Sequence, residues 1–236
     1  MPRPCRQHSL GLLSRAPWVA DRLPNRLIRQ ERDATSVSPS TPPNLQDLAK
    51  RAQVFDRNIL SDLPQDLSKV LASADADKRI LNQNELTAVC RWAGTDAEPL
   101  WILQGLMHPL VDQAKAELLR QHPELTLPGG ELHPEHRAEA CWRDCFHFLR
   151  VSIYGTALDQ DDITHSEGMK ALVELYELVN VPLPALLDAL EHLRRISTDV
   201  MSGLASGRQA ARLGGILGSI CEKIRNEMKT DEASCQ

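Results

Sequence analysis

The sequence predicts an all-α fold. Leucine and alanine, which favour helices, dominate its apolar positions, whereas aromatic residues make up only 4% of the 236 residues. No stretch of useful length shows the alternation of apolar and polar residues that is typical of a strand. Helix caps and helix breakers divide the chain into segments of helical length. These three observations indicate a string of helices without a sheet.

The composition excludes several classes of protein. The chain is 42% hydrophobic and 25% charged, with a formal net charge of −5, as in ordinary globular proteins. A nucleic-acid-binding protein would carry a basic surface, and no apolar run is long enough to predict membrane insertion. The six cysteines are irregularly spaced and form no CxxC motif, so we expect free thiols in a reducing compartment.

The first 62 residues differ from the rest of the chain. Residues 1–33 are rich in arginine, and residues 34–43 are a polar, proline-rich linker. We expect 1–62 to be a disordered extension, with a basic docking arm as the alternative. Within it, 44–62 is expected to contain a short helix, with one apolar stripe formed by Leu45, Leu48, Ala52 and Phe55. Residues 63–229 form the predicted globular domain, and 230–236 a flexible tail.

The first three helices of the domain are expected at 64–75, 82–93 and 96–121. Asn82 or Asn84 can cap the second helix, and Thr95 or Asp96 the third. The third helix should end at His122, because the following proline disfavours helical backbone at the residue before it.

The remaining helices are expected at 134–158, 163–179, 183–196 and 204–228. The first of them follows the turn Pro128-Gly129-Gly130, which does not fit a helix interior, and Pro134 suits its first turn. The acidic run at 159–162 ends it. Thr164 and Glu167 then have the spacing of a capping box.

The helix at 134–158 carries the strongest chemical signal. Arg137, Cys141 and Asp144 are spaced i, i+4 and i+7, so they share one face. A cation, a soft nucleophile and a carboxylate on one face suit the holding and covalent tethering of an anionic, nitrogen-bearing ligand. Cys141, Cys145 and His147 lack a fourth ligand at a usual zinc spacing, so no metal site is predicted.

This region resembles the chromophore-attachment region of the phycobiliproteins, the bilin-carrying antenna subunits of cyanobacteria and red algae. The shared residues are Pro128-Gly129-Gly130, Arg137, Cys141-Trp142-Arg143-Asp144, Leu149-Arg150 and Tyr154. Upstream, 66–89 resembles the N-terminal helical hairpin of that family, and downstream, 172–194 resembles its next two helices. The resemblance extends in colinear order over about 63–228.

The resemblance implies a globin-like body with an added N-terminal helical pair, and one linear tetrapyrrole (phycocyanobilin or a related bilin). Cys141 would hold the tetrapyrrole by a thioether. Asp144 would accept hydrogen bonds from the pyrrole nitrogens, and Arg143 and Arg137 would pair with the propionates. Trp142 would either pack in the core or lie beside the bilin.

The resemblance also implies a partner. In the family, an aspartate of the N-terminal pair meets an arginine of the long helix across a subunit interface, and Asp75, Arg150 and Tyr154 fill the matching positions. We therefore expect a heterodimer with a complementary phycobiliprotein subunit, possible ring assembly and possible linker proteins. The apolar face of the helical pair would be wet in a monomer; its residues are Leu67, Val70, Leu71, Ile80, Leu86 and Val89.

Two departures limit the expected chemistry. Glu131 stands where β-type subunits carry a methylated asparagine, and Met201 stands where some have a second attachment cysteine, so at most one bilin is expected. The implied function is that of a non-enzymatic antenna subunit on the cytoplasmic face of the thylakoid membrane. The alternative is a non-antenna adaptor or assembly factor of the same fold that binds bilin weakly or not at all. Haem binding is disfavoured, because His165 and His192 lie near predicted helix ends.

Overall fold

The computed structural model describes residues 45–205 and 207–234, and this part of the chain is all-α, as the sequence predicts. Its elements are α1 (Leu45–Arg51), η3 (Arg57–Asp62), α2 (Gln65–Ala76), α3 (Gln83–Ala93), α4 (Ala97–Gln121), η4 (Pro123–Thr126), α5 (Glu135–Ala157), α6 (Ser166–Leu178), α7 (Leu183–Leu204) and α8 (Gly207–Ser234). Over the same residues the only β-type pairing is an isolated bridge between Phe55 and Thr164. The expectations for 1–44 lie outside the described residues.

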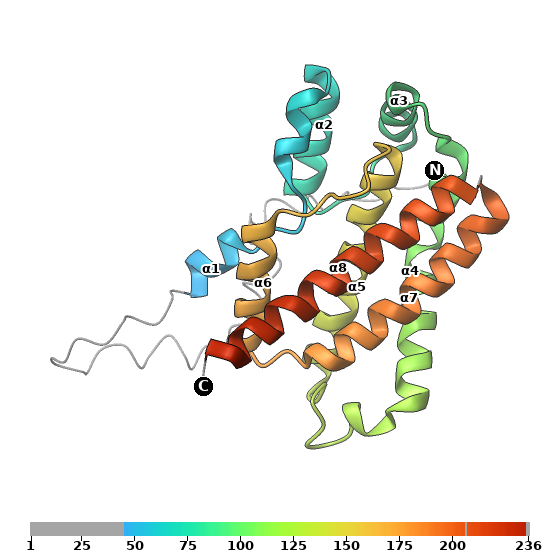
Figure 1. Cartoon of the computed structure of the whole chain (residues 1–236). Coiled ribbons are helices and arrows are strands. Elements are labelled where there is room, and N and C mark those ends of the chain that lie inside the picture. Colours follow the sequence, from blue (N-terminus) through green and yellow to red (C-terminus); the bar gives the residue numbers. More distant parts are fainter. Residues whose placement is uncertain (1–44, 206, 235–236) are drawn as a thin grey trace, which may run out of the picture.

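The long helices form one packed body. α4 packs against α7, α7 against α8, and α5 against both α4 and α8. The helical pair α2–α3 stands at one end of this body, and the connection from α4 to α5 lies at the opposite end (Figure 1). The core between the helices is built from leucine, isoleucine and alanine, with Phe148, Tyr154 and Tyr176 as its large rings.

α3 and α4 begin at caps that the sequence indicates. The side chain of Asn82 accepts a hydrogen bond from the Glu85 N–H at 3.0 Å, and Glu85 accepts one from the Asn82 N–H at 2.9 Å, which together form a capping box. Asp96, rather than Thr95, caps α4. The Thr95 hydroxyl instead donates to the Ala157 carbonyl, 2.8 Å away, and so ties the start of α4 to the end of α5.

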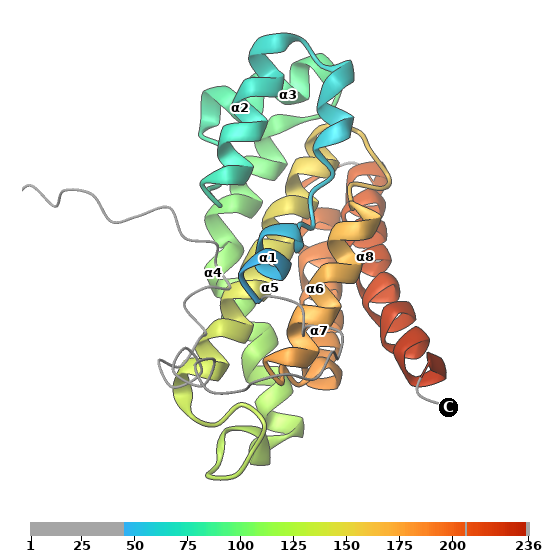
Figure 2. The same cartoon turned by 90° about the vertical axis from the view of Figure 1, so that its left-hand side faces the viewer.

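Residues 45–62 contain a short helix, but they are not helical along their whole length. α1 ends at Arg51, and the chain then pairs briefly with the connection between α5 and α6. The Asp56 N–H donates to the Ile163 carbonyl at 2.8 Å, and the His165 N–H donates to the Val54 carbonyl at 3.0 Å. Figure 2 shows α1 beside α6, the helix against which it packs. Backbone pairing with this connection therefore replaces the helical continuation that the apolar stripe predicts.

Several ends of the last three helices differ from the expected ones. α6 begins at Ser166, and its cap is His165, whose Nδ1 accepts from the Gly168 N–H at 2.9 Å. Thr164 is not part of a capping box, because its hydroxyl donates to Asp162 at 2.7 Å. α7 continues to Leu204 and α8 to Ser234, so the helix extends into the segment expected to be a flexible tail.

The helical pair buries more of its apolar face than expected. Leu71, Leu86 and Val89 are fully buried within the chain itself, and the other expected interface residues are partly buried against the same core. Gln104 of α4 holds the connection between α2 and α3 in place, because its side-chain amide donates to the Leu81 carbonyl at 3.0 Å. The expectation that this face stays wet in a single chain is therefore wrong for these three residues, because the body of the chain covers them.

Candidate functional site

α5 carries the candidate site residues on two different faces. Arg137, Cys141 and Asp144 share the face that the spacing predicts. Arg143 follows Cys141 by two positions, which turns its direction by about 200° around the helix axis. It shares a face with His147, Arg150 and Tyr154 instead. The residues expected to surround one ligand are thus divided between two sides of α5.

Cys141 lies inside the protein with only 2% of its surface exposed. Its nearest chemical partner is Cys145, one turn along α5. A hydrogen bond with Cys141, together with burial, raises the pKa of Cys145 well above that of an ordinary thiol. Cys145 therefore stays protonated near neutral pH and is a packing residue rather than a nucleophile.

Asp144 and Arg137 connect α5 to α6. Asp144 is 1% exposed, and the Tyr176 hydroxyl of α6 donates to its Oδ2 at 2.9 Å. The guanidinium of Arg137 donates to the Asn180 carbonyl, just beyond the end of α6. Both side chains of the predicted face thus help to hold the two helices together beside Cys141.

Trp142 and Arg143 lie at the edge of the protein, and both are partly buried. Lys115 of α4 lies over the Trp142 ring, 5.7 Å from its centroid, in a cation–π contact. The indole Nε1 is buried and has no hydrogen-bond partner among the described residues. A buried N–H donor of this kind usually has a partner, so Trp142 offers a donor that a bound group could use.

The turn before α5 has the backbone that its glycines predict. Gly129 has a φ of 91°, which is unfavourable for other residues. At Gly130, an added Cβ would lie 2.2 Å from the Glu124 carbonyl oxygen, so no side chain fits. The two glycines therefore serve the close packing of the loop, which sets the start of α5 about two turns before Cys141.

Asp75, Arg150 and Tyr154 do come together, but within one chain. Arg150 Nη2 donates to Asp75 Oδ1 at 3.1 Å, and Arg150 Nη1 donates to the Tyr154 hydroxyl at 2.9 Å. The side chains of Asp75 and Arg150 are only 4% and 2% exposed. α2 of this chain already places Asp75 beside its own α5, so the contact that the resemblance implies across a subunit interface forms here within one chain. The interface role of these three residues stays a prediction.

Four of the exposed large apolar residues lie on α3 and α4. Trp92 of α3 is 43% exposed, and Trp101, Ile102 and Leu106 of α4 are 38%, 39% and 37% exposed. We call these four residues the α3–α4 apolar face. Large apolar side chains gathered on a surface usually mark a site of interaction.

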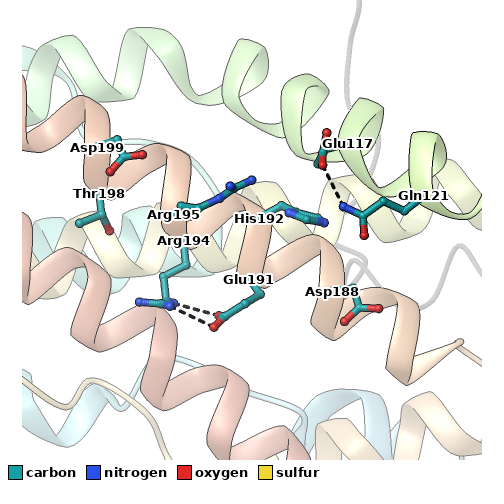
Figure 3. A pocket seen from close by; sticks show the side chains of 9 residues that line it. All are labelled: Glu117, Gln121, Asp188, Glu191, His192, Arg194, Arg195, Thr198 and Asp199. Carbon is teal, nitrogen blue, oxygen red and sulfur yellow. Dashed lines mark hydrogen bonds and ion pairs between the residues drawn. The ribbon is translucent and has the colours of Figure 1, made fainter.

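A polar groove of about 540 Å³ lies between α4 and α7. Figure 3 shows His192 between Arg195 and the α4 residues Glu117 and Gln121. Hydrogen bonds from Arg120 and Gln121 lower the pKa of Glu117 to about 2, and Arg194 pairs with Glu191 at 2.9 Å. These ion pairs form within single helices, and we assign no ligand to the groove.

Two features are absent from the described residues. No group of three or more histidine, cysteine, aspartate or glutamate side chains there is arranged to hold a metal ion. None of the helices in that part of the chain is long and apolar enough to span a membrane. Met201, at the position of a possible second attachment cysteine, is fully buried.

Sequence reasoning missed two partners, Tyr176 for Asp144 and Arg57 for Asp75. Arg57 donates to Asp75 Oδ2 from Nε at 3.2 Å and from Nη2 at 3.0 Å. The chain has only two tyrosines, and both donate or accept at a predicted site residue. Because tyrosine is so rare in this chain, Tyr176 could have been singled out from the sequence as a candidate site residue. Arg57 had no such signal, because its position depends on the break in 44–62.

Most of the described chain is similar to known proteins. The family model described as "Phycobilisome protein" matches residues 69–227. Allophycocyanin subunit alpha-B of Synechocystis sp. is 30% identical over 147 residues, covering 61% of this chain and 89% of the relative. Allophycocyanin alpha chains of Thermosynechococcus vestitus and Cyanophora paradoxa are 25% and 27% identical, covering 65% and 63% of this chain and 98% and 91% of their own lengths.

Proposed function

The chain belongs to the phycobilisome protein family, and from this premise we propose that it is a light-harvesting subunit that carries one bilin on Cys141. The observation that carries the proposal is the position of Asp144 one turn after Cys141 on α5. Both residues follow the glycine turn and lie within the range that the family model matches. The allophycocyanin names of its relatives agree with an antenna role.

The side chains around Cys141 suit a linear tetrapyrrole. When bound, such a pigment supplies a conjugated system that absorbs visible light. The Cys141 sulfur would add to a carbon–carbon double bond of a pigment side chain, with the thiol proton ending on the neighbouring carbon, so that no group leaves. Asp144 would accept hydrogen bonds from the pyrrole N–H groups, and the free Nε1 donor of Trp142 offers a further contact.

Attachment requires the site to open. Cys141 is covered, and the bonds Asp144–Tyr176 and Arg137–Asn180 hold α5 to the end of α6 beside it. Parting these contacts would expose the thiol and release Asp144 and Arg137 toward a ligand. Arg143, on the other side of α5, would reach a propionate only around the edge of the helix. Burial of the finished adduct would then keep water from the pigment.

We propose that the working cycle is energy transfer, in which no bond is made or broken. The protein would act in the cytoplasm, at the thylakoid surface, paired with a phycobiliprotein subunit of complementary type and open to ring assembly and linker proteins. The α3–α4 apolar face supports such a pairing, because its tryptophans offer the large apolar area that centres many interfaces.

The second candidate is an adaptor or assembly factor that keeps the family fold without a pigment. The closed surroundings of Cys141 favour this candidate, since its neighbours Asp144 and Arg137 are bonded to α6. The two candidates differ in one property, the presence of covalent pigment.

Pigment attachment is tested by producing the protein in cells that make phycocyanobilin and the bilin lyases. The denatured protein is then separated on a gel and its zinc-enhanced fluorescence is recorded. We expect fluorescence for the natural chain and for Cys145→Ala, and none for Cys141→Ala. Fluorescence that Cys141→Ala retains would contradict the assignment of Cys141. The absence of pigment from every variant, with a known allophycocyanin labelled in parallel, would favour the adaptor.

A further inference from the structure

An excess of positive charge surrounds Asp75, at the corner where α2 meets α5. Arg57 donates to Oδ2 at 3.0 Å, Arg150 donates to Oδ1 at 3.1 Å, and the Lys78 ammonium lies 3.6 Å from Oδ1. Three cations on one carboxylate leave a net charge of +2 (3 − 1). Both oxygens of Asp75 are in use, so Asp75 cannot balance the cations further.

Two nearby carboxylates, Glu85 and Asp77, have other partners. Glu85 forms a two-bond ion pair with Arg79, at 2.7 and 2.9 Å. Asp77 accepts from the Ser73 hydroxyl at 3.3 Å, and its charge acts on Arg79. A partly buried surplus of charge is costly unless a counter-charge is close.

The positive field extends along α5. Burial and the charges of Arg150, Lys78 and Arg143 lower the pKa of His147 to about 3, although Asp75 acts in the opposite direction. Burial, together with Arg150 and Arg57, also lowers the pKa of Lys78, against the attraction of Asp75. Burial is the main cause of both shifts, and the nearby positive charges add to it.

The cluster has donors left, and it opens to solvent on one side. Arg150 is nearly fully buried, and its Nε has no hydrogen-bond partner among the described residues. The side chains of Arg57 and Lys78 are 43% and 29% exposed. A ligand would therefore approach along Arg57 and Lys78, with Arg150 beneath them. Guanidinium groups and an ammonium group suit the oxygens of a carboxylate or phosphate.

We propose that this cluster, formed by Arg57, Lys78 and Arg150 around Asp75, binds one oxyanion, a carboxylate or a phosphate. The ligand neutralises the surplus charge and locks the helical pair onto α5, since its partners come from η3, the connection just after α2, and α5. The site is separate from Cys141 and does not depend on bilin attachment.

The test uses the whole chain, with inorganic phosphate and succinate as probes against sodium chloride at equal ionic strength. Binding is followed by the NMR shifts of the His147 ring and by thermal unfolding. We expect saturable His147 shifts with at least one probe. The preferred probe separates the two sources, phosphate indicating a phosphoryl group and succinate a carboxylate. Lys78→Met should weaken binding by roughly tenfold or more, as for a lost charge-assisted hydrogen bond.

Lys69→Met is the matched control, because Lys69 is an exposed lysine of α2, the helix that ends two residues before Lys78. It should bind as the natural chain does. Arg57→Met provides a second, partly exposed position, in case Lys78→Met folds poorly. Phosphate stabilises many proteins without binding, so equal effects on the natural chain and both cluster variants would overturn the proposal. Non-saturable His147 shifts with both probes would overturn it as well.

Discussion

Asp75 shows how one residue combines fold and electrostatics. Burial raises the pKa of its carboxyl, but Lys78, Arg150 and Arg57 outweigh this, and the pKa is lowered overall. The carboxylate is therefore charged at neutral pH while 3% exposed. Without it, the buried guanidinium of Arg150 would lose its counter-charge.

Asp75→Asn should destabilise the folded protein by about 3–5 kcal/mol at pH 7, because it leaves Arg150 buried without a negative partner. Urea unfolding measures this loss. Asp77→Asn, a change at the exposed end of the same helix, is the control and should cost about 0.5 kcal/mol or less.

The same variant has a defined pH dependence. The folded pKa of Asp75 lies below its unfolded value of about 3.9. Its contribution is therefore present above that value and is lost as the pH falls through the folded pKa. The stability difference between the natural chain and Asp75→Asn should shrink below about pH 4. A difference that stays constant down to pH 3 would contradict the lowered pKa.

At the residue scale, the sequence predicted which residues share a helix face better than it predicted what surrounds them. Cys141 and Asp144 share a face of α5, as their spacing predicts. Asp75 meets Arg150 as well, but within the chain, whereas the resemblance implies a contact between subunits. The division of Arg143 from Cys141 was also implicit in the spacing, because residues two apart on a helix point in nearly opposite directions. The burial of Cys141 and the bond from Tyr176 depend on α6, and no local pattern encodes them.

At the scale of elements, the least expected feature is the segment 45–62. It crosses α6 so closely that an added Cβ at Gly168 would lie 2.0 Å from the Gln53 carbonyl oxygen. Phe55 is fully buried and packs edge-on against Tyr154, with ring centroids 5.8 Å apart. The segment thus joins the core through one ring and one close backbone contact, and it brings Arg57 to Asp75.

Gly168→Ala should weaken the docking of 45–62 and cost about 2 kcal/mol, as for overpacking. Hydrogen exchange should become faster in 45–62, while α7 and α8 keep their protection. Gly105→Ala is the control: Gly105 lies in the interior of α4 with open space around it, so alanine should stabilise by about 0.5–1 kcal/mol. Unchanged exchange in 45–62 in Gly168→Ala would mean that the contact does not hold the segment.

Helix ends were predictable where a cap or breaker is strong. The starts of α3 and α4 and the end of α4 lie within about one residue of the positions predicted from Asn82, Asp96 and the proline after His122. α7 continues past its expected end because Ser197 and Met201 are buried in the core, and packing overrides the weak helical preference of the polar residues between them. The start of α6 moved because Thr164 bonds to Asp162 instead of capping.

For the whole molecule, the α3–α4 apolar face is the surface we expect a partner to cover. Trp101→Lys should weaken association with a complementary phycobiliprotein subunit by about 2 kcal/mol or more, because a central tryptophan often dominates an interface. Size-exclusion chromatography with light scattering measures the complex. Leu127→Lys is the control, since Leu127 is 58% exposed on the connection at the opposite end of the body. Equal weakening by both variants would place the interface elsewhere.

The central claim, a pigment on Cys141, is tested most directly by peptide mass spectrometry of the protein purified from its native cells. Trypsin cleaves after Arg137, Arg143 and Arg150, so Cys141 falls in peptide 138–143 and Cys145 in peptide 144–150. We predict that 138–143 carries the added mass and visible absorption of one bilin, and that 144–150 is unmodified. Full recovery of an unmodified 138–143 peptide, with bilin found on the other phycobiliproteins of the same cells, would contradict the account.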